Sequence, residues 1–281
     1  MYHLLSADFY RLFKNKLFWL SMAFVAASQL YMTAANYLMN RGTGEGQYYP
    51  LTWIFFEWFV PVGFVTALVC AWLVGESQED GLLRIRLAGG CDRVQMYLCH
   101  VVVCVSAGMM MAGVYLLLSC TLGAAVMQPP ALPLSAMLYD TLVLLLGMAA
   151  LCAMFTFLAS LTPHRALALA VCIGWYLVMT FVSLRLVNAL REEALIWTEQ
   201  PVIGTHDVEW LTRPNPAYVD GTRRRACIWW CDLLPTAQAM QISDYDFSLF
   251  GRPPRMMVFS VCEMVGCTAA GMAAFVRKDV R

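Results

Sequence analysis

Six long apolar stretches constrain the fold of this chain more than any other feature of its sequence. They cover residues 17–38, 52–74, 94–127, 136–161, 166–187 and 256–276. About 20 consecutive apolar residues cross the hydrocarbon core of a bilayer as a helix, which satisfies its own backbone hydrogen bonds. The sequence therefore predicts an all-α membrane protein with six transmembrane helices in a single domain. The stretch 94–127 is longer than a bilayer requires, so we expect part of it to be tilted or to extend beyond the membrane.

The composition agrees with this class, because 60% of the 281 residues are hydrophobic and only 14% are charged. The formal net charge is zero, and no domain-wide basic surface indicates a nucleic-acid partner. Arg223, Arg224 and Arg225 form the one basic cluster, which we interpret as a solvated helix face. The first apolar stretch is too long for the apolar region of a signal peptide, so we expect it to remain as a membrane span.

The distribution of Lys and Arg predicts the orientation. With a cytoplasmic N-terminus, the short outer loops carry only Arg41, whereas the cytoplasmic segments are basic. The segment 188–255 then lies outside, and segments of this length translocate largely regardless of charge. We therefore predict a multi-pass protein of the cytoplasmic membrane with both termini in the cytoplasm. The basic residues of its cytoplasmic segments are Arg11, Lys14, Lys16, Arg84, Arg86, Arg93, Arg165, Arg277, Lys278 and Arg281.

Two short segments beside the spans have amphipathic patterns. In residues 2–16, four apolar residues share a face opposite Arg11 and Lys14, which predicts an interfacial helix lying on lipid headgroups. A charged flank that anchors the first span is the alternative. In 75–93, a short helix is expected from Gly81 to the Gly89-Gly90 pair. Such a helix on the membrane face suits docking to a soluble partner, and an ordinary polar loop is the alternative.

Several motifs occur in a fixed order along the chain. The amphipathic sequence 7–13 precedes the first span, and the segment after the second span has a Glu, a Gly that opens a short basic and apolar helix, and then Gly and Arg. The stretches 215–222, 232–238 and 275–280 follow later. In this order the motifs resemble those of the permeases of type-2 ABC transporters, although Ala237 stands where that family often has Gly. The matching residues after the second span are Glu76, Gly81, Leu82, Arg84, Gly90 and Arg93.

The resemblance implies the transmembrane subunit of a bacterial ATP-driven exporter. Two such subunits, identical or different, would enclose a path for the substrate and rest on two copies of an ATP-binding subunit. The chain has no Gly-x-x-x-x-Gly-Lys-Ser/Thr motif, so ATP and Mg are expected on the partner, and we expect this chain to have no cofactor, metal site or catalytic residues. Closure of the partner would push the segment 75–93 and tilt the second and third spans. The residues expected to couple to the ATPase are Glu76, Glu79, Gly81, Leu82, Arg84, Arg86 and Arg93.

Ionisable residues inside the predicted spans are candidates for a polar network near the outer side. Each costs roughly 2.5 to 3.5 kcal/mol on insertion scales when it is left in lipid. The four residues are Glu57, Asp140, Arg185 and Glu263. For Asp140 and Arg185 we favour contact with interfacial water, and for Glu57 and Glu263 a buried network or cavity lining. His100 is interpreted as a packing histidine.

The outer segment 188–255 is predicted to be partly helical, with a helical piece at 227–241 broken at Pro235. By the family resemblance, such pieces dip back toward the outer leaflet, and a small cap that packs on itself is the alternative. Cys227 and Cys231 are four residues apart, which places them on one helix face as candidates for a disulfide.

Two other functional classes remain as alternatives. A proton-driven secondary transporter would use Glu57, Glu263 and His100 and would need no ATPase, but the six spans show no convincing inverted repeat. A membrane-embedded enzyme has less support, because the chain contains neither a His-Glu-x-x-His nor a Gly-x-Ser-x-Gly motif.

Overall fold

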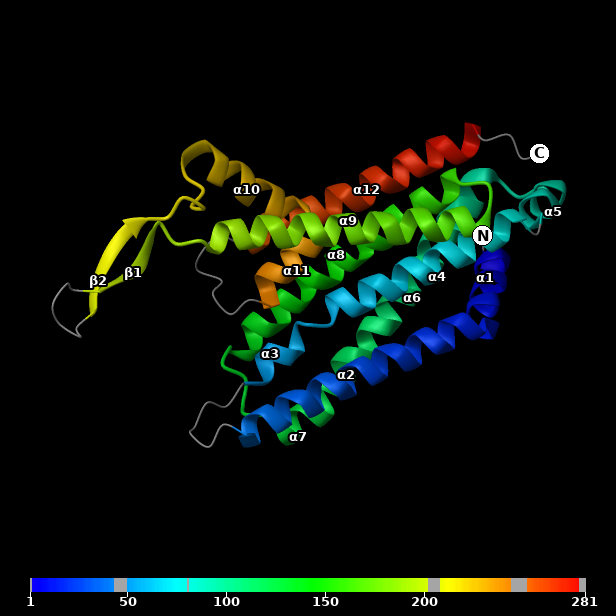
Figure 1. Ribbon diagram of the computed structural model, residues 1–281. Coiled ribbons are helices and arrows are strands. Elements are labelled where there is room, and N and C mark those ends of the chain that lie inside the picture. The colour runs from blue at the N-terminus through cyan, green and yellow to red at the C-terminus, as the bar shows by residue number, and fades with distance from the viewer. Residues whose placement is uncertain (1, 43–49, 80, 202–207, 244–251, 278–281) are drawn as a thin grey trace.

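The computed structural model describes residues 2–42, 50–79, 81–201, 208–243 and 252–277. Within them, six helices are long and apolar enough to cross a membrane, which confirms the prediction of a six-span helical membrane protein. Figure 1 shows these helices side by side in an elongated bundle. The six are α2 (Lys16–Gly42), α4 (Phe59–Glu79), α6 (Arg93–Leu118), α8 (Leu134–Leu161), α9 (Arg165–Arg191) and α12 (Pro253–Arg277).

The remaining elements lie at the two ends of the bundle (Figure 1). One end carries α1 and α5 together with the C-terminal part of α12, and we call it the α5 end. The other carries α3, α10, α11 and a β-hairpin, and we call it the hairpin end. These elements are α1 (Tyr2–Lys14), α3 (Leu51–Phe55), α5 (Leu82–Ala88), the π-helical turn η1 (Ser119–Gly123), α7 (Ala124–Val126), β1 (Leu195–Pro201), β2 (Val208–Pro214), α10 (Gly221–Leu233) and α11 (Pro235–Ser243).

Helix α8 is the centre of the bundle and packs against α4, α6, α9 and α12. Its buried face contains several small residues, among them Gly147, Ala149 and Ala150, which let neighbouring helices approach closely. By contrast, α2, α9 and α12 present large apolar side chains on the outside of the bundle, which suits lipid or another membrane subunit. These exposed side chains include Leu20, Phe24, Leu177, Phe181, Val258 and Val265.

The second span differs from the predicted range 52–74. The short helix α3 ends at Phe55, and α4 begins only at Phe59, so Glu57 lies in the connection between them. Pro61 explains the new start, because proline lacks an N–H and is tolerated in the first turn of a helix, where no intrahelical acceptor is needed. At its other end, α4 continues to Glu79, five residues past the predicted boundary at 74.

The segment 188–255 contains a β-hairpin that the all-α prediction missed. Strands β1 and β2 pair antiparallel, with Leu195 opposite Pro214 and Pro201 opposite Val208. The prolines occupy strand ends, where a missing ladder hydrogen bond is tolerated. The predicted helical piece does break near Pro235, since α10 ends at Leu233 and α11 starts at Pro235. Asp80, residues 202–207 and 244–251, Lys278 and Arg281 belong to predicted segments but lie outside the described residues.

Candidate functional site

Helix α5 occupies the place between the second and third spans where the sequence predicts a short helix. Gly81 precedes it with a φ of 65°, and Gly90 follows it with a φ of 80°, both in the left-handed region that glycine tolerates. The N–H of Gly89 donates to the carbonyl of Ile85 at 3.0 Å and so closes the last turn. Asp92 precedes α6 with extended backbone but makes no side-chain capping hydrogen bond.

Arg86 attaches α5 to α1. Its Nη1 donates to Oδ2 of Asp8 at 3.0 Å, and its Nη2 contacts Oδ1 of the same carboxylate. Asp8 is only 4% exposed, so this pair lies largely out of water. The two hydrogen bonds to the carboxylate raise the pKa of Arg86 because they favour the charged guanidinium. The N-terminal helix therefore buries its one carboxylate against α5.

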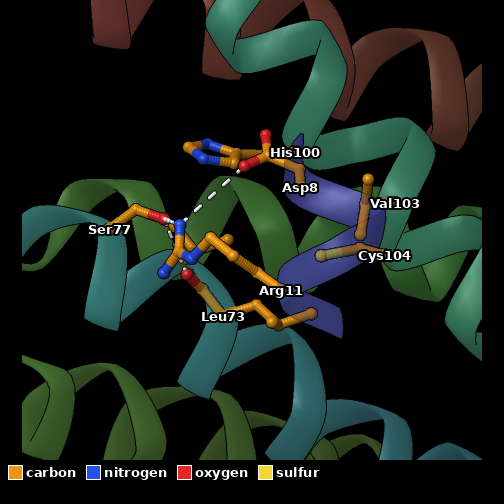
Figure 2. A pocket seen from close by; sticks show the side chains of 8 residues that line it. Asp8, Arg11, Leu73, Ser77, His100, Val103 and Cys104 are labelled. Atoms are coloured by element: carbon orange, nitrogen blue, oxygen red, sulfur yellow. Dashed lines mark hydrogen bonds and ion pairs between the residues drawn. The ribbon is translucent and has the colours of Figure 1, made fainter. Parts of the chain in front are cut away.

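Arg11 makes the second link between α1 and the spans. Its Nη2 lies 2.9 Å from Oε2 of Glu76, its Nη1 donates to Oγ of Ser77 at 3.0 Å, and Nη1 lies 3.8 Å from Oδ1 of Asp8. Figure 2 shows Arg11 reaching between Ser77 on α4 and Asp8 on its own helix. A cavity of about 10 Å³ adjoins these side chains, which is about the size of one water molecule. Its lining is Asp8, Arg11, Leu73, Val74, Ser77, His100, Val103 and Cys104.

Glu79 joins the end of α4 to the start of α9. Its Oε2 lies 3.2 Å from Nε of Arg165, and its Oε1 accepts a hydrogen bond from the backbone N–H of Arg165 at 2.8 Å. A carboxylate at a helix N-terminus satisfies an unpaired N–H and interacts favourably with the helix dipole. The guanidinium of Arg165 also stacks over the Trp72 ring, with 4.6 Å between Cζ and the ring centroid.

Apolar contacts complete the attachment of α5. Leu83 is buried against Met96 and Tyr97 of α6 and Phe275 of α12. Arg93 at the start of α6 donates to the carbonyl of Val276 at 2.9 Å, which ties α6 to the end of α12. These contacts tie α1, α4, α6, α9 and α12 together at the α5 end.

Four of the predicted coupling residues contact other parts of this chain. These four are Glu76, Glu79, Arg86 and Arg93, as described above, and Leu82 is half-buried. Only the backbone of Arg84 is described. Ile85 is instead the large apolar side chain that α5 exposes, at 67%. Asp8, Ser77 and Arg165 were not predicted as the partners of these residues. For Asp8, the sequence does contain a signal, because it is the one carboxylate in a basic amphipathic helix.

The predicted outer polar network is not formed among the described residues. No ion pair there joins Glu57, Asp140, Arg185 and Glu263. Arg185 is exposed over the Phe181 ring at 5.1 Å, and Glu57 is exposed in the α3–α4 connection. Asp140 is buried, and Oε2 of Glu263 is buried without a hydrogen-bond partner. These four residues were predicted to form a network because they lie toward the same side of the membrane along their spans. Depth in the membrane does not determine the face of a helix on which a side chain lies.

Cys227 and Cys231 are free thiols on α10, so the candidate disulfide is not formed. Residues four apart on a helix hold their Cβ atoms about 5 to 6 Å apart, whereas a disulfide needs about 3.5 to 4.5 Å. Burial raises the pKa of Cys231 to about 12, which keeps its thiol protonated.

A buried polar cluster fastens α10 and α11 to the spans at the hairpin end. Asp232 is fully buried, and its Oδ2 lies 3.4 Å from Nε of Arg255 on α12. Gln238 donates to the carbonyl of Asp232 at 2.7 Å and accepts from Ser260 at 3.0 Å. Burial raises the pKa of Asp232 to about 6, and the charge of Arg255 opposes that rise.

Comparison with protein-family models and with curated proteins gives no match for this chain. The described residues contain no group of three or more His, Cys, Asp or Glu side chains that could hold a metal ion.

Proposed function

We propose that this protein is the membrane-spanning permease subunit of a bacterial ATP-driven exporter, similar to those of type-2 ABC transporters. The observation that carries the proposal is α5, a short helix between two spans that is fastened to the bundle by ion pairs and exposes Ile85. Two copies of an ATP-binding subunit would hold ATP and Mg and would dock on α5, and a second permease subunit would complete the path. In this arrangement the α5 end faces the cytoplasm.

The ion pairs would make the α5 end move as a unit. A displacement of α5 reaches α1 through Arg86 and Asp8, and a displacement of α4 reaches α9 through Glu79 and Arg165. Separating a buried pair leaves an uncompensated charge and costs about 3 to 5 kcal/mol, so the Arg86–Asp8 contact resists being pulled apart. Closure of the ATPase dimer would therefore tilt several helices together and switch the bundle between two states.

A photo-crosslinking experiment tests the docking surface. The amino acid p-benzoylphenylalanine is placed at Ile85 in the full-length protein, and crosslinked chains are identified by mass spectrometry after irradiation of cells. We expect a crosslink to an ATP-binding subunit. The matched control is the same substitution at Leu134, which is 71% exposed but belongs to the first turn of α8 at the hairpin end. Crosslinks to the ATPase from Leu134 but none from Ile85 would contradict the proposal.

Gentle purification distinguishes the exporter from a proton-driven carrier. The tagged protein is isolated in mild detergent, co-purifying chains are identified, and ATP hydrolysis is assayed on the same sample. The exporter proposal expects an ATP-binding chain in equal amount to the permease subunits and measurable ATPase activity. A lone chain without ATPase activity and without the Ile85 crosslink would favour the proton-driven carrier instead.

A further inference from the structure

A cavity of about 210 Å³ lies between α3, the start of α8 and the end of α11. It is far from α5, because α8 starts at the hairpin end and runs along the bundle to the α5 end (Figure 1). Its wall is mostly apolar, and its polar groups come from Thr52, Asp140 and Ser243. The lining residues are Thr52, Phe56, Leu132, Ala136, Asp140, Ile242 and Ser243.

Asp140 is a carboxylate without a protein partner in this cavity. Its residue is 7% exposed, and among the described residues none forms an ion pair or hydrogen bond with its side chain. The hydroxyl of Thr52 is also buried without a hydrogen-bond partner, in a residue that is 2% exposed. The hydroxyl of Ser243 already has a hydrogen-bond partner, because its Oγ donates to the carbonyl of Ala239 at 2.8 Å. Two polar side chains without a protein partner among the described residues thus line one mostly apolar space.

A buried hydroxyl and a nearly buried carboxylate, both without a protein partner, indicate a ligand that supplies hydrogen-bond donors and a positive charge. An ionised carboxylate only accepts hydrogen bonds, and a charge in a membrane span is expensive unless another group compensates it. A cation in the cavity provides the opposite charge and N–H donors for both Asp140 and Thr52. Unpaired ionisable residues in spans often mark binding sites or pathways for this reason.

The wall determines the kind of cation. Calcium takes six to eight oxygen ligands, and magnesium needs an octahedral shell, which one carboxylate and two hydroxyls do not provide. Phe56, Leu132 and Ile242 instead provide an apolar and aromatic surface, which favours an organic group and a cation near an aromatic ring. We propose that this cavity binds a small organic ammonium ion with a compact apolar group, with Asp140 as its counter-charge and Thr52 as a hydrogen-bond acceptor. This inference does not rest on the exporter proposal, because it concerns binding to this chain alone.

Binding of tritiated phenethylamine to the purified full-length protein tests the inference, by scintillation proximity in detergent without nucleotide. We expect saturable binding of one phenethylammonium per chain. Asp140→Asn should weaken it at least tenfold, and Thr52→Val by about threefold to tenfold, as expected for lost interactions with a charged ligand. Glu263→Gln is the matched control, because it also removes a carboxylate from a span but lies outside the cavity lining; its affinity should stay within twofold of wild type.

The neutral isostere 2-phenylethanol separates charge recognition from apolar binding. It should compete at least tenfold less well than unlabelled phenethylamine against wild type. If Asp140→Asn does not fold, Ala136→Phe provides the second variant, since a large side chain at the cavity wall should abolish binding of the amine. Absence of saturable binding by wild type, unchanged affinity in Asp140→Asn or in a folded Ala136→Phe, or equal competition by the alcohol each overturns the proposal.

Discussion

Asp8 is the residue at which the contacts of the α5 end meet. Its two carboxylate oxygens accept hydrogen bonds from Arg86 of α5. Its Oδ1 also lies 3.8 Å from Nη1 of Arg11 on its own helix, and Arg11 in turn pairs with Glu76 of α4. A buried ion pair gives little net stability relative to apolar residues, because removing two charges from water is costly. Removing one partner is different, since the other charge then stays buried and unpaired. The main contribution of Asp8 is therefore to fix the position of α5 against α1.

Arg86→Gln should lower the free energy of unfolding by about 3 kcal/mol, near the low end for a broken buried pair because Arg11 still compensates Asp8. The double variant Asp8→Asn/Arg86→Gln should recover part of this loss, since no buried charge then lacks a partner. Denaturant titration of the purified variants provides the measurement. Arg185→Gln is the control, because Arg185 is exposed and forms no ion pair among the described residues; it should change stability by less than about 0.5 kcal/mol. A double variant as unstable as the sum of its single variants would contradict the pairing.

Asp232 should make stability depend on pH. Its pKa rises from 3.8 to about 6 on folding, so the folded protein binds the proton more tightly than the unfolded chain. The free energy of unfolding should therefore fall as pH rises from about 4 to about 6 and stay low above that window. At about 1.4 kcal/mol per pKa unit, this contribution is about 3 kcal/mol.

Asp232→Asn removes this titration, so the variant should gain stability relative to wild type as pH rises. Denaturant titrations at pH 4.5 and pH 7.5 measure the difference between the two proteins at each pH. Other titrating groups act equally on both proteins and cancel in that difference. Parallel pH profiles for wild type and variant would show that Asp232 does not carry the shift.

At the scale of elements, the crossing of α6 and α12 fixes the position of α5, because Leu83 packs on Tyr97 and Phe275 there. Gly271 allows this crossing. A Cβ at Gly271 would overlap the hydroxyl and ring of Tyr97 and lie 3.0 Å from its Cε2. Gly266 on the same helix faces open space, with no atom within 4 Å of a Cβ built there.

Gly271→Ala should destabilise the protein by about 1 to 3 kcal/mol, the usual cost of forcing an extra carbon into a packed contact. Gly266→Ala should be neutral or stabilise by up to about 1 kcal/mol, because alanine is the better helix former. Thermal unfolding of both variants in the same detergent compares them directly. Combining Gly271→Ala with Tyr97→Phe should restore part of the loss, since the hydroxyl is then gone. Equal melting temperatures for the two alanine variants would exclude a tight α6–α12 crossing.

Elements could be predicted from the sequence where a run of neighbouring residues carries the pattern. Apolar runs of helical length give the six spans, and flanking glycines give α5 between Gly81 and Gly89. The break before Phe59 and the β-hairpin were missed, because a short amphipathic or aromatic stretch in a membrane protein fits helix, strand and interface alike. The partners of Asp8 and Glu79 could not be predicted either. Each is about 80 positions away from its arginine, and one sequence contains no information on which faces meet.

At the scale of the whole molecule, the two ends of the bundle have different chemistry. The α5 end carries the basic side chains of α1, α5 and the starts of α6 and α9, and it is built from short connections. The hairpin end carries the long segment with α10 and α11, which contributes Trp229 and Trp230 to its exposed surface. Basic residues in short loops stay on the cytoplasmic side, and exposed tryptophans favour the membrane interface. Both patterns agree with α5 inside and the hairpin outside.

Native cysteines can test this orientation without a tag. Cys91 follows α5, and Cys227 lies on α10; both are partly exposed at opposite ends of the bundle. A membrane-impermeant maleimide should label Cys227 but not Cys91 in intact cells, and Cys91 but not Cys227 in inside-out vesicles. The variants Cys91→Ser and Cys227→Ser assign each labelled site, and labelling after denaturation shows that equal amounts of protein are present. With an even number of spans, both termini lie on the same side of the membrane as α5. The reverse labelling pattern would therefore place α5 and both termini outside the cell, and it would remove any contact between α5 and a cytoplasmic ATPase.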